Sequence, residues 1–234
     1  MKLFQVILIL TLSSVFALGS SVKEVVKGIQ ADNNQSRIPK NDHLFCGGSI
    51  IGETWILTAA HCTINAPKVL ISYASLKHLQ GTIIESIVIF NHPKYNEISY
   101  ENDAALINTP RIQFTRLVNK IPLIDSQSTP YYKKMEWSAA IGWGSTNTNS
   151  SLSENLRYTY LRTINSKFCT EINAKLCANA IICASTLRGN SICHGDSGGP
   201  LVTSDKARLI GISSFGIGHC ENRLPVGFTQ IMHV

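Results

Sequence analysis

Residues 195–200, with the sequence GDSGGP, are the most informative stretch of this 234-residue chain. The hydroxyl of Ser197 is a weak nucleophile, so chemistry at this serine requires an adjacent base and a closely placed backbone. The flanking glycines allow a sharp turn and bring backbone N–H groups near the reacting atom. Such groups can bind the oxyanion of a tetrahedral intermediate, and losing one donor costs about 2.7–4 kcal/mol of transition-state stabilisation. An ordinary glycine-rich turn is the competing interpretation, and it explains this order of residues poorly.

Two other segments contain the groups that a nucleophilic serine requires. His61 lies within residues 58–62 (TAAHC), at the end of an apolar segment, and a base is best held on a rigid element. Asp103 precedes the apolar run 104–107, so we expect a partly buried carboxylate, for which an imidazole N–H is a good partner. Taken alone, a histidine is more often a surface residue and such an aspartate more often a cap or turn. Together with Ser197 they predict a nucleophile, a base and an orienting carboxylate.

The composition is typical of a folded globular protein. Apolar residues make up 44% of the chain and charged residues 15%, which suits a packed core rather than disorder. The net charge of +6 comes from scattered lysines and arginines, with only Lys133 and Lys134 adjacent. We therefore expect a solvated basic surface without nucleic-acid binding. Beyond the N-terminal apolar run no segment approaches transmembrane length, so no membrane contact is expected.

The N-terminus has the pattern of a secretory signal peptide. Lys2 precedes the apolar run 3–12, and residues 17–19 (ALG) offer a cleavage site between small residues. The run is too short to span a bilayer, so a signal peptide is favoured over a core helix. We therefore predict a secreted, extracellular protein with a signal peptide at 1–19, a short propeptide at 20–24 and one folded domain at 25–234.

Short apolar segments alternate with turn residues along the rest of the chain, which favours many short strands. No long helical period occurs, so the pattern predicts a β-barrel or sandwich with little helix. Residues 145–153 are polar and are expected to form an exposed loop. The predicted strands are residues 55–60, 69–73, 82–90, 104–108, 137–141, 156–164, 201–203, 209–213 and 226–231.

The order histidine, aspartate, serine is that of the chymotrypsin type. With residues 46–50 (CGGSI) and 142–144 (GWG), the motifs resemble the chymotrypsin/trypsin-like serine proteases (peptidase S1), especially secreted insect digestive enzymes. The resemblance begins near Val25 and continues to the C-terminus. It implies an all-β fold of two six-stranded antiparallel barrels, at about 25–118 and 119–234, with the active site in the cleft between them.

The resemblance also implies a serine endopeptidase that forms an acyl-enzyme and uses no cofactor or metal. In that family the base, His61, takes the proton of Ser197 while Asp103 fixes the imidazole tautomer. The oxyanion hole would consist of the amides of Gly195 and Ser197, and Ser214 would hydrogen-bond near Asp103.

Secretion implies that the seven cysteines form disulfides with one thiol left over. The chain has no CxxC pair, which argues against a zinc site. The resemblance implies the pairs Cys46–Cys62, Cys169–Cys183 and Cys193–Cys220. Cys177 is then either a small buried apolar residue or a competitor for pairing with Cys169 and Cys183.

The resemblance places the floor of the primary specificity pocket at Ser191 and its walls at Ser214, Phe215, Gly216 and Val226. Trypsin-like members have an aspartate at the floor, and a neutral hydroxyl cannot offset the desolvation of a substrate cation. Gly216 leaves one wall open, whereas Val226 replaces the usual glycine and shortens the pocket unless it points elsewhere. We expect cleavage after uncharged apolar P1 residues, those preceding the scissile bond, such as Leu, Met, Val or Ala.

Activation in this family requires a new N-terminus, here Val25, that pairs with Asp196. Cleavage of the zymogen after Lys23 would leave Glu24 as an extra residue before Val25 at the new N-terminus. Cleavage after Glu24 requires a protease that prefers acidic residues. Lys27 also stands where a glycine is usual. Without an α-amino partner, a buried Asp196 would be destabilising by about 3–5 kcal/mol, and the oxyanion amides would be misplaced.

Two further departures concern the fold. The spacing from Ala31 to Cys46 is short for the family, which leaves open a degenerate or missing first strand, and the sequence stops before the family's C-terminal helix. These departures support a second hypothesis, a secreted, unactivated homologue that binds peptides or inhibitors without turnover. The expected partners are protein or peptide substrates and protease inhibitors, and the expected state is a monomer. The sequons at Asn34 and Asn149 leave glycan occupancy open.

Overall fold

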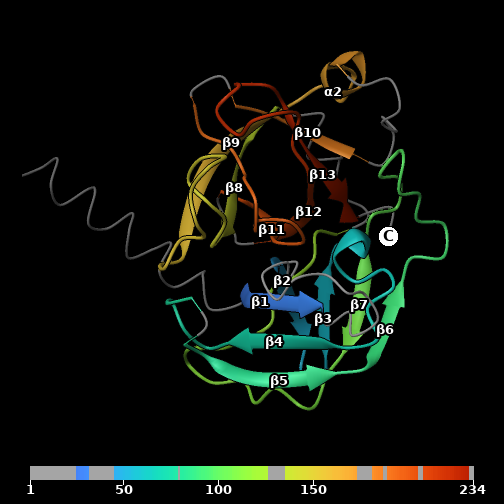
Figure 1. Ribbon diagram of the computed structural model, residues 1–234, viewed down its shortest axis with the longest axis vertical. Helices are drawn as coiled ribbons and strands as arrows, with labels where there is room; N and C mark the ends of the chain where they lie inside the picture. Colours follow the sequence, from blue (N-terminus) through green and yellow to red (C-terminus); the bar gives the residue numbers. More distant parts are fainter. Residues whose placement is uncertain are drawn as a thin grey trace, which may run out of the picture.

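The computed structural model describes residues 25–31, 45–78, 80–125, 135–172, 181–186, 189–204 and 208–231. Two bodies of β-structure lie one above the other (Figure 1), with β1–β7 in the lower body and β8–β13 in the upper one. We call them barrel 1 and barrel 2. In the described part of the chain, no helix is both long enough and apolar enough to cross a membrane.

Strands dominate the described residues. Barrel 1 contains β1 (Val25–Ala31), β2 (Phe45–Gly52), β3 (Trp55–Thr58), β4 (Val69–Tyr73), β5 (Thr82–Ser86), β6 (Val88–Asn91) and β7 (Ala105–Asn108). Barrel 2 contains β8 (Trp137–Gly142), β9 (Arg157–Ile164), β10 (Ile181–Ser185), β11 (Pro200–Thr203), β12 (Leu209–Phe215) and β13 (Val226–Gln230). Within the described ranges the helical elements are short, namely the 3-10 turn η2 (Ala60–Cys62) and the helix α2 (Lys167–Ile172).

Barrel 2 is a closed, fully antiparallel barrel with the strand order β10-β13-β12-β11-β8-β9. Alternation along its strands sends one set of side chains inward. Leu161, Ile182, Leu201 and Phe228 are fully or almost fully buried in one apolar cluster. This barrel confirms the fold class expected from the sequence.

Barrel 1 is a sheet with the order β5-β4-β1-β2-β3-β7-β6, and the two strands at its ends are consecutive in the chain. Only Ile87 separates them, so the predicted strand 82–90 is one segment with a kink. The hydroxyl of Ser86 makes this kink, because it accepts the Val88 N–H at 3.1 Å and donates to the Asn108 carbonyl at 2.6 Å. The sheet is therefore curved, and the chain passes through Ile87 from β5 at one end of the sheet to β6 at the other.

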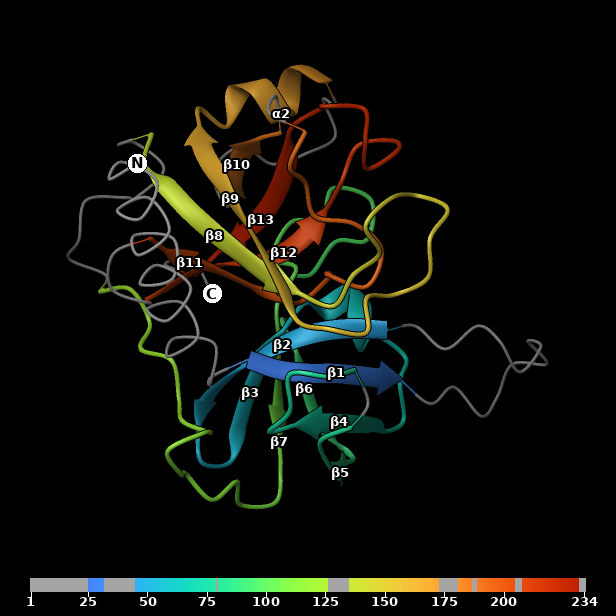
Figure 2. The ribbon, with the colours of Figure 1, turned by 90° about the vertical axis from the view of Figure 1, so that its left-hand side faces the viewer.

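The first strand is present despite the short spacing before Cys46. β1 pairs with β2 on one side and with β4 on the other, so the possibility of a missing first strand is wrong. Figure 2 shows β1 between these neighbours. The C-terminal helix, the signal peptide, the propeptide, Cys177 and Asn34 lie outside the described residues.

All nine predicted strands are present, with ends shifted by a few residues at most. The predictions missed β1, β2 and β10. The sequence IICAS of β10 is buried at its first four positions, so it shows no alternation of apolar and polar residues. Two consecutive glycines interrupt the pattern in β2. The predicted loop 145–153 lies between β8 and β9.

The two barrels meet at the turn that contains Ser197. The N–H of Gly47 on β2 donates to the carbonyl of Ser197 at 2.7 Å. A Cβ atom on Gly47 would lie only 2.9 Å from the Cα of Gly199. The glycine therefore permits a backbone approach that no larger residue allows.

Replacing Gly47 by alanine is expected to lower the free energy of unfolding by about 1–3 kcal/mol, because backbone atoms must move apart. Gly52→Ala on the same strand is the matched control, since its Cβ would meet only the Trp55 side chain at 3.5 Å or more. Denaturant unfolding of both variants measures the difference. Equal stability of the two variants would show that the contact between the barrels tolerates a methyl group.

Candidate active site

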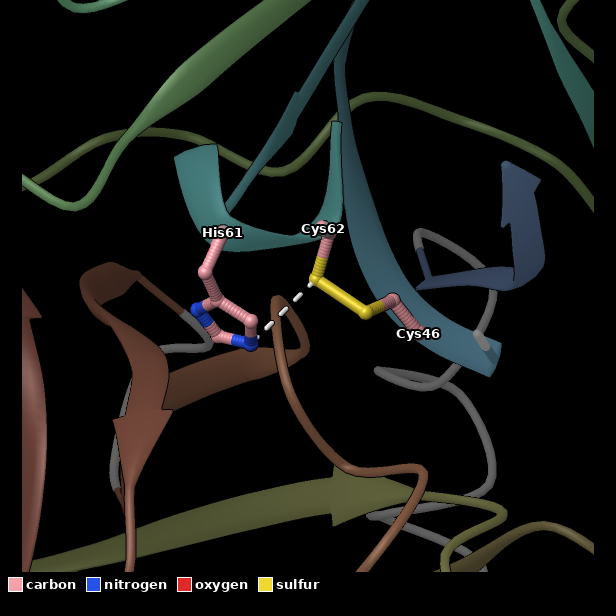
Figure 3. A group of neighbouring side chains, drawn as sticks. All are labelled: Cys46, His61 and Cys62. Atoms are coloured by element: carbon pink, nitrogen blue, oxygen red, sulfur yellow. Dashed lines mark hydrogen bonds between the residues drawn. A yellow bond between two sulfur atoms is a disulfide. The ribbon is translucent and has the colours of Figure 1, made fainter. Parts of the chain in front are cut away.

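His61 is held by a short rigid segment between two elements of barrel 1. β3 ends at Thr58, and the turn η2 carries His61 and Cys62. A disulfide joins Cys62 to Cys46 on β2 (Figure 3). The histidine thus projects from a turn that is fixed to the neighbouring strand, and its side chain is 19% exposed.

Asp103 precedes β7 and is completely buried. Its carboxylate accepts the His61 backbone N–H at 2.9 Å, the Nδ1–H of the same residue at 2.7 Å and the Ser214 hydroxyl at 2.6 Å. A carboxylate only accepts hydrogen bonds, so Nδ1 must carry the proton in this contact. In the neutral imidazole, Nε2 is then the basic nitrogen.

Ser197 lies on the wall of the same cleft as His61, a cavity of about 250 Å³. Among the described residues, no hydrogen bond joins Ser197 Oγ to His61 Nε2, and Cys62 Sγ lies 3.6 Å from Nε2 (Figure 3). In enzymes without substrate such a bond is often long and shortens in the complex. The arrangement places the hydroxyl and the imidazole on one solvent-accessible cleft, with the buried carboxylate hydrogen-bonded to the imidazole.

The turn before Ser197 has the shape of an anion-binding backbone loop. Gly195 has a φ of +92°, and a Cβ there would overlap the Leu152 side chain, so glycine is required. The Asp196 N–H donates to the Cys193 carbonyl at 3.0 Å and tightens this turn. Among the described residues, the N–H groups of Gly195 and Ser197 have no protein acceptor. Two free donors on the residues that flank Asp196 suit a developing oxyanion.

Asp196 points away from Ser197 into barrel 2. Its carboxylate accepts the N–H of Gly144 at 2.8 Å and that of Cys193 at 3.0 Å. Burial raises the pKa of Asp196 from 3.8 to about 6, although the two N–H donors act in the opposite direction. The expected partner, Val25, is the first residue of β1 and lies opposite Ser49 as an internal residue of the chain. The expected ion pair is therefore not part of this structure.

The predicted pocket residues line the same cleft as Ser197. Ser191, Phe215, Gly216 and Val226 all contribute to its wall, and Val226 is 2% exposed. The Ser191 hydroxyl donates to the Ile192 carbonyl at 2.9 Å. A Cβ on Gly216 would meet nothing within 4 Å, so this wall is open.

Several residues of the cleft were not predicted from the sequence. The ring of Tyr100 lies 6.1 Å from that of His61 and 5.7 Å from that of Phe215, measured between centroids. His194 and His219 also line the cleft. No motif marks these three residues, because they come from loops whose course depends on the packed barrels.

Three disulfides are present, and they join the pairs implied by the resemblance, namely Cys46–Cys62, Cys169–Cys183 and Cys193–Cys220. Two described groups of side chains superficially resemble metal sites. Each contains one histidine, His61 or His194, beside two cysteines of a disulfide. A disulfide has no thiolate to bind a metal, so neither group suits one.

A family model described as Trypsin matches residues 25–234. The chain belongs to the trypsin family. Two curated relatives, a collagenase from Hypoderma lineatum and Serine protease 1 from Drosophila melanogaster, are each 38% identical to this trypsin-family chain. The matches cover 80% and 82% of this chain and 72% and 73% of the relatives. The solved structure of HL collagenase has a TM-score of 0.78 at 33% identity, over 92% of this chain and 91% of its own. This trypsin-family protein is a serine endopeptidase, and its substrates are proteins.

The buried Asp196 makes a prediction about pH for the uncleaved trypsin-family chain. Because its pKa is raised on folding, the folded state binds the proton more tightly, so the stabilising contribution of protonated Asp196 is complete below pH 4 and is lost as pH rises through about 6. The contribution of Asp196 amounts to about 2–3 kcal/mol. Denaturant unfolding between pH 4 and 7, compared with Asp196→Asn, measures it. An identical pH dependence in both proteins would contradict the assignment.

Proposed function

We propose that the chain is a secreted serine endopeptidase that cleaves after uncharged, small to medium apolar P1 residues through an acyl-enzyme. The observation that carries the proposal is the buried Asp103 carboxylate, which orients the imidazole of His61 at the cleft that Ser197 also lines. A buried charge with this partner has a clear chemical use, because it leaves Nε2 free to accept a proton.

In the proposed mechanism, Ser197 Oγ attacks the scissile carbonyl carbon while its proton passes to Nε2 of His61. The N–H groups of Gly195 and Ser197 bind the resulting oxyanion. The imidazolium then donates the proton to the leaving amine, and the C–N bond breaks. Water, deprotonated by the same nitrogen, attacks the acyl carbon. The bond from this carbon to Ser197 Oγ then breaks, Oγ takes the proton from the imidazolium, and the carboxylic acid is released. Asp103 stays ionised and stabilises the imidazolium in both halves of the reaction.

Maturation is part of the proposal. A signal peptide at 1–19 and a propeptide at 20–24 would be removed, and the new α-amino group of Val25 would pair with Asp196. A cavity of about 270 Å³ beside Asp196, partly lined by Gly142 and Gly144, supports this because it has room for a terminal ammonium group. The family's protease relatives do not support the non-catalytic alternative. We further propose a monomer that protease inhibitors recognise and that binds neither nucleic acid nor membranes.

The catalytic roles are tested with a fluorophosphonate, which reacts covalently with an activated serine. Protein with Val25 at its N-terminus is expected to be labelled at Ser197, whereas Ser197→Ala is expected to show no label. Asp103→Asn is expected to react about 10⁴-fold more slowly, because the wrong imidazole tautomer is favoured. Mass spectrometry of the labelled peptide identifies the site. Folded wild-type protein that takes no label would refute the proposed function.

The pocket assignment predicts a change in selectivity. Val226→Gly is expected to raise kcat/KM for P1 Phe relative to P1 Val by about 10–200-fold. One methylene more or less in an apolar pocket changes the discrimination between substrates by about this factor. Peptides that differ only at P1 provide the measurement. Val226→Ala, which disturbs the barrel less, is expected to give an intermediate ratio. An unchanged ratio in both variants, or a wild-type preference for Arg or Lys, would show that Val226 and Ser191 do not set the specificity.

A further inference from the structure

The loop 145–153 and the turn 218–222 are joined by hydrogen bonds that neither the fold nor the triad requires. Thr148 donates twice to Glu221, through its backbone N–H to Oε1 and through its hydroxyl to Oε2, both at 2.8 Å. Both oxygens of one carboxylate are thus used by a single residue 73 positions away. Charge-assisted bonds of this kind are stronger than neutral ones.

A third bond closes the arrangement and fixes its direction. The Cys220 N–H donates to the Thr148 hydroxyl oxygen at 3.0 Å. Since an ionised carboxylate accepts only, the Thr148 hydroxyl gives its proton to Glu221 and accepts from Cys220. The two bonds from Thr148 and the backbone N–H of Glu221 itself, with a smaller contribution from His219, lower the pKa of Glu221. We call this three-residue group of Thr148, Cys220 and Glu221 the rim clamp.

The rim clamp connects to the chemistry through the Cys193–Cys220 disulfide. The same loop contacts the other side of this bridge, because the Ser145 hydroxyl lies 3.1 Å from Cys193 Sγ. The Ser145 N–H also donates to the carbonyl of His194 at 2.8 Å. Cys193, His194 and Cys220 all line the cleft that contains Ser197. The loop therefore contacts the mouth of the cleft at two points.

The turn 218–222 has little other support among the described residues. It belongs to no strand, and Gly218 adopts a φ of +70°. Its internal bond runs from the Asn222 N–H to the His219 carbonyl at 3.0 Å. Without the rim clamp, the backbone at Cys220 would be held chiefly by its disulfide, which leaves the orientation of the peptide group free.

We propose that Thr148 and Glu221 are positioning residues that hold the turn 218–222, and with it the wall of the specificity pocket, in the geometry that binds the P1 side chain. This inference rests on the proposed function, since it concerns the same cleft. It assigns to the loop 145–153 a role in substrate binding through Cys220, without direct contact between Thr148 and the substrate.

The test uses three threonine variants of the processed protein. Thr148→Val removes the hydroxyl and keeps the branched shape, whereas Thr148→Ser keeps the hydroxyl. Thr146→Val on the same loop is the control, because among the described residues its hydroxyl hydrogen-bonds only to Ser150 Oγ, at 3.4 Å. We expect KM for a peptide with P1 Leu to rise about 3–10-fold in Thr148→Val, as for the loss of one or two hydrogen bonds, with kcat nearly unchanged. Thr148→Ser and Thr146→Val are expected to match the wild type.

A second readout does not depend on turnover. The amide of Cys220 is expected to exchange its hydrogen faster in Thr148→Val than in the other two variants, since its acceptor is lost. Wild-type turnover with an unchanged KM in Thr148→Val would overturn the inference and leave the proposed function intact. If the wild type showed no turnover while the Cys220 amide still exchanged its hydrogen slowly, the proposed function would instead be refuted.

Discussion

The buried carboxylate of Asp103 is the constraint on which the active cleft depends. A charge with no access to water is tolerated only when hydrogen bonds compensate for its lost solvation, and removing one partner costs about 3–5 kcal/mol. The donors to Asp103 come from both barrels, His61 from barrel 1 and Ser214 from β12 of barrel 2. The carboxylate is therefore satisfied only when the two barrels pack together, and the same packing orients the imidazole.

The turn at Ser197 is fixed by both barrels in a similar way. Gly47 of β2 donates to its carbonyl, and the Gly198 N–H donates to the Ser213 carbonyl of β12 at 2.7 Å. Gly198 has a φ of +75°, and a Cβ there would overlap the Thr58 hydroxyl. Backbone hydrogen bonds thus fix the position of Ser197, and the side chain of His61 provides the base that accepts its proton. In our proposal the rim clamp fixes the pocket wall in a similar way, through hydrogen bonds to the turn 218–222.

Most of the fold could be predicted from the sequence, because a strand with one buried face shows an alternation of apolar and polar residues. β4 was predicted with the bounds Val69–Tyr73 that the structure has. β10 was missed, since a strand buried on both faces gives no alternation. Contiguous motifs predicted the candidate triad. In the structure His61 and Ser197 line one cleft, and the buried Asp103 contacts His61 from behind. The bonds between Thr148 and Glu221 were not predictable, because loops determine their approach and neither residue belongs to a motif.

The three disulfides have a consequence for the integrity of the molecule. Cys46–Cys62 lies within barrel 1, whereas Cys169–Cys183 and Cys193–Cys220 lie within barrel 2. None of these three bridges links the barrels, so the chain between β7 and β8 is the tether that keeps His61 and Ser197 on one polypeptide. A single nick in that tether would turn the enzyme into a noncovalent dimer of fragments, whose activity would then depend on protein concentration.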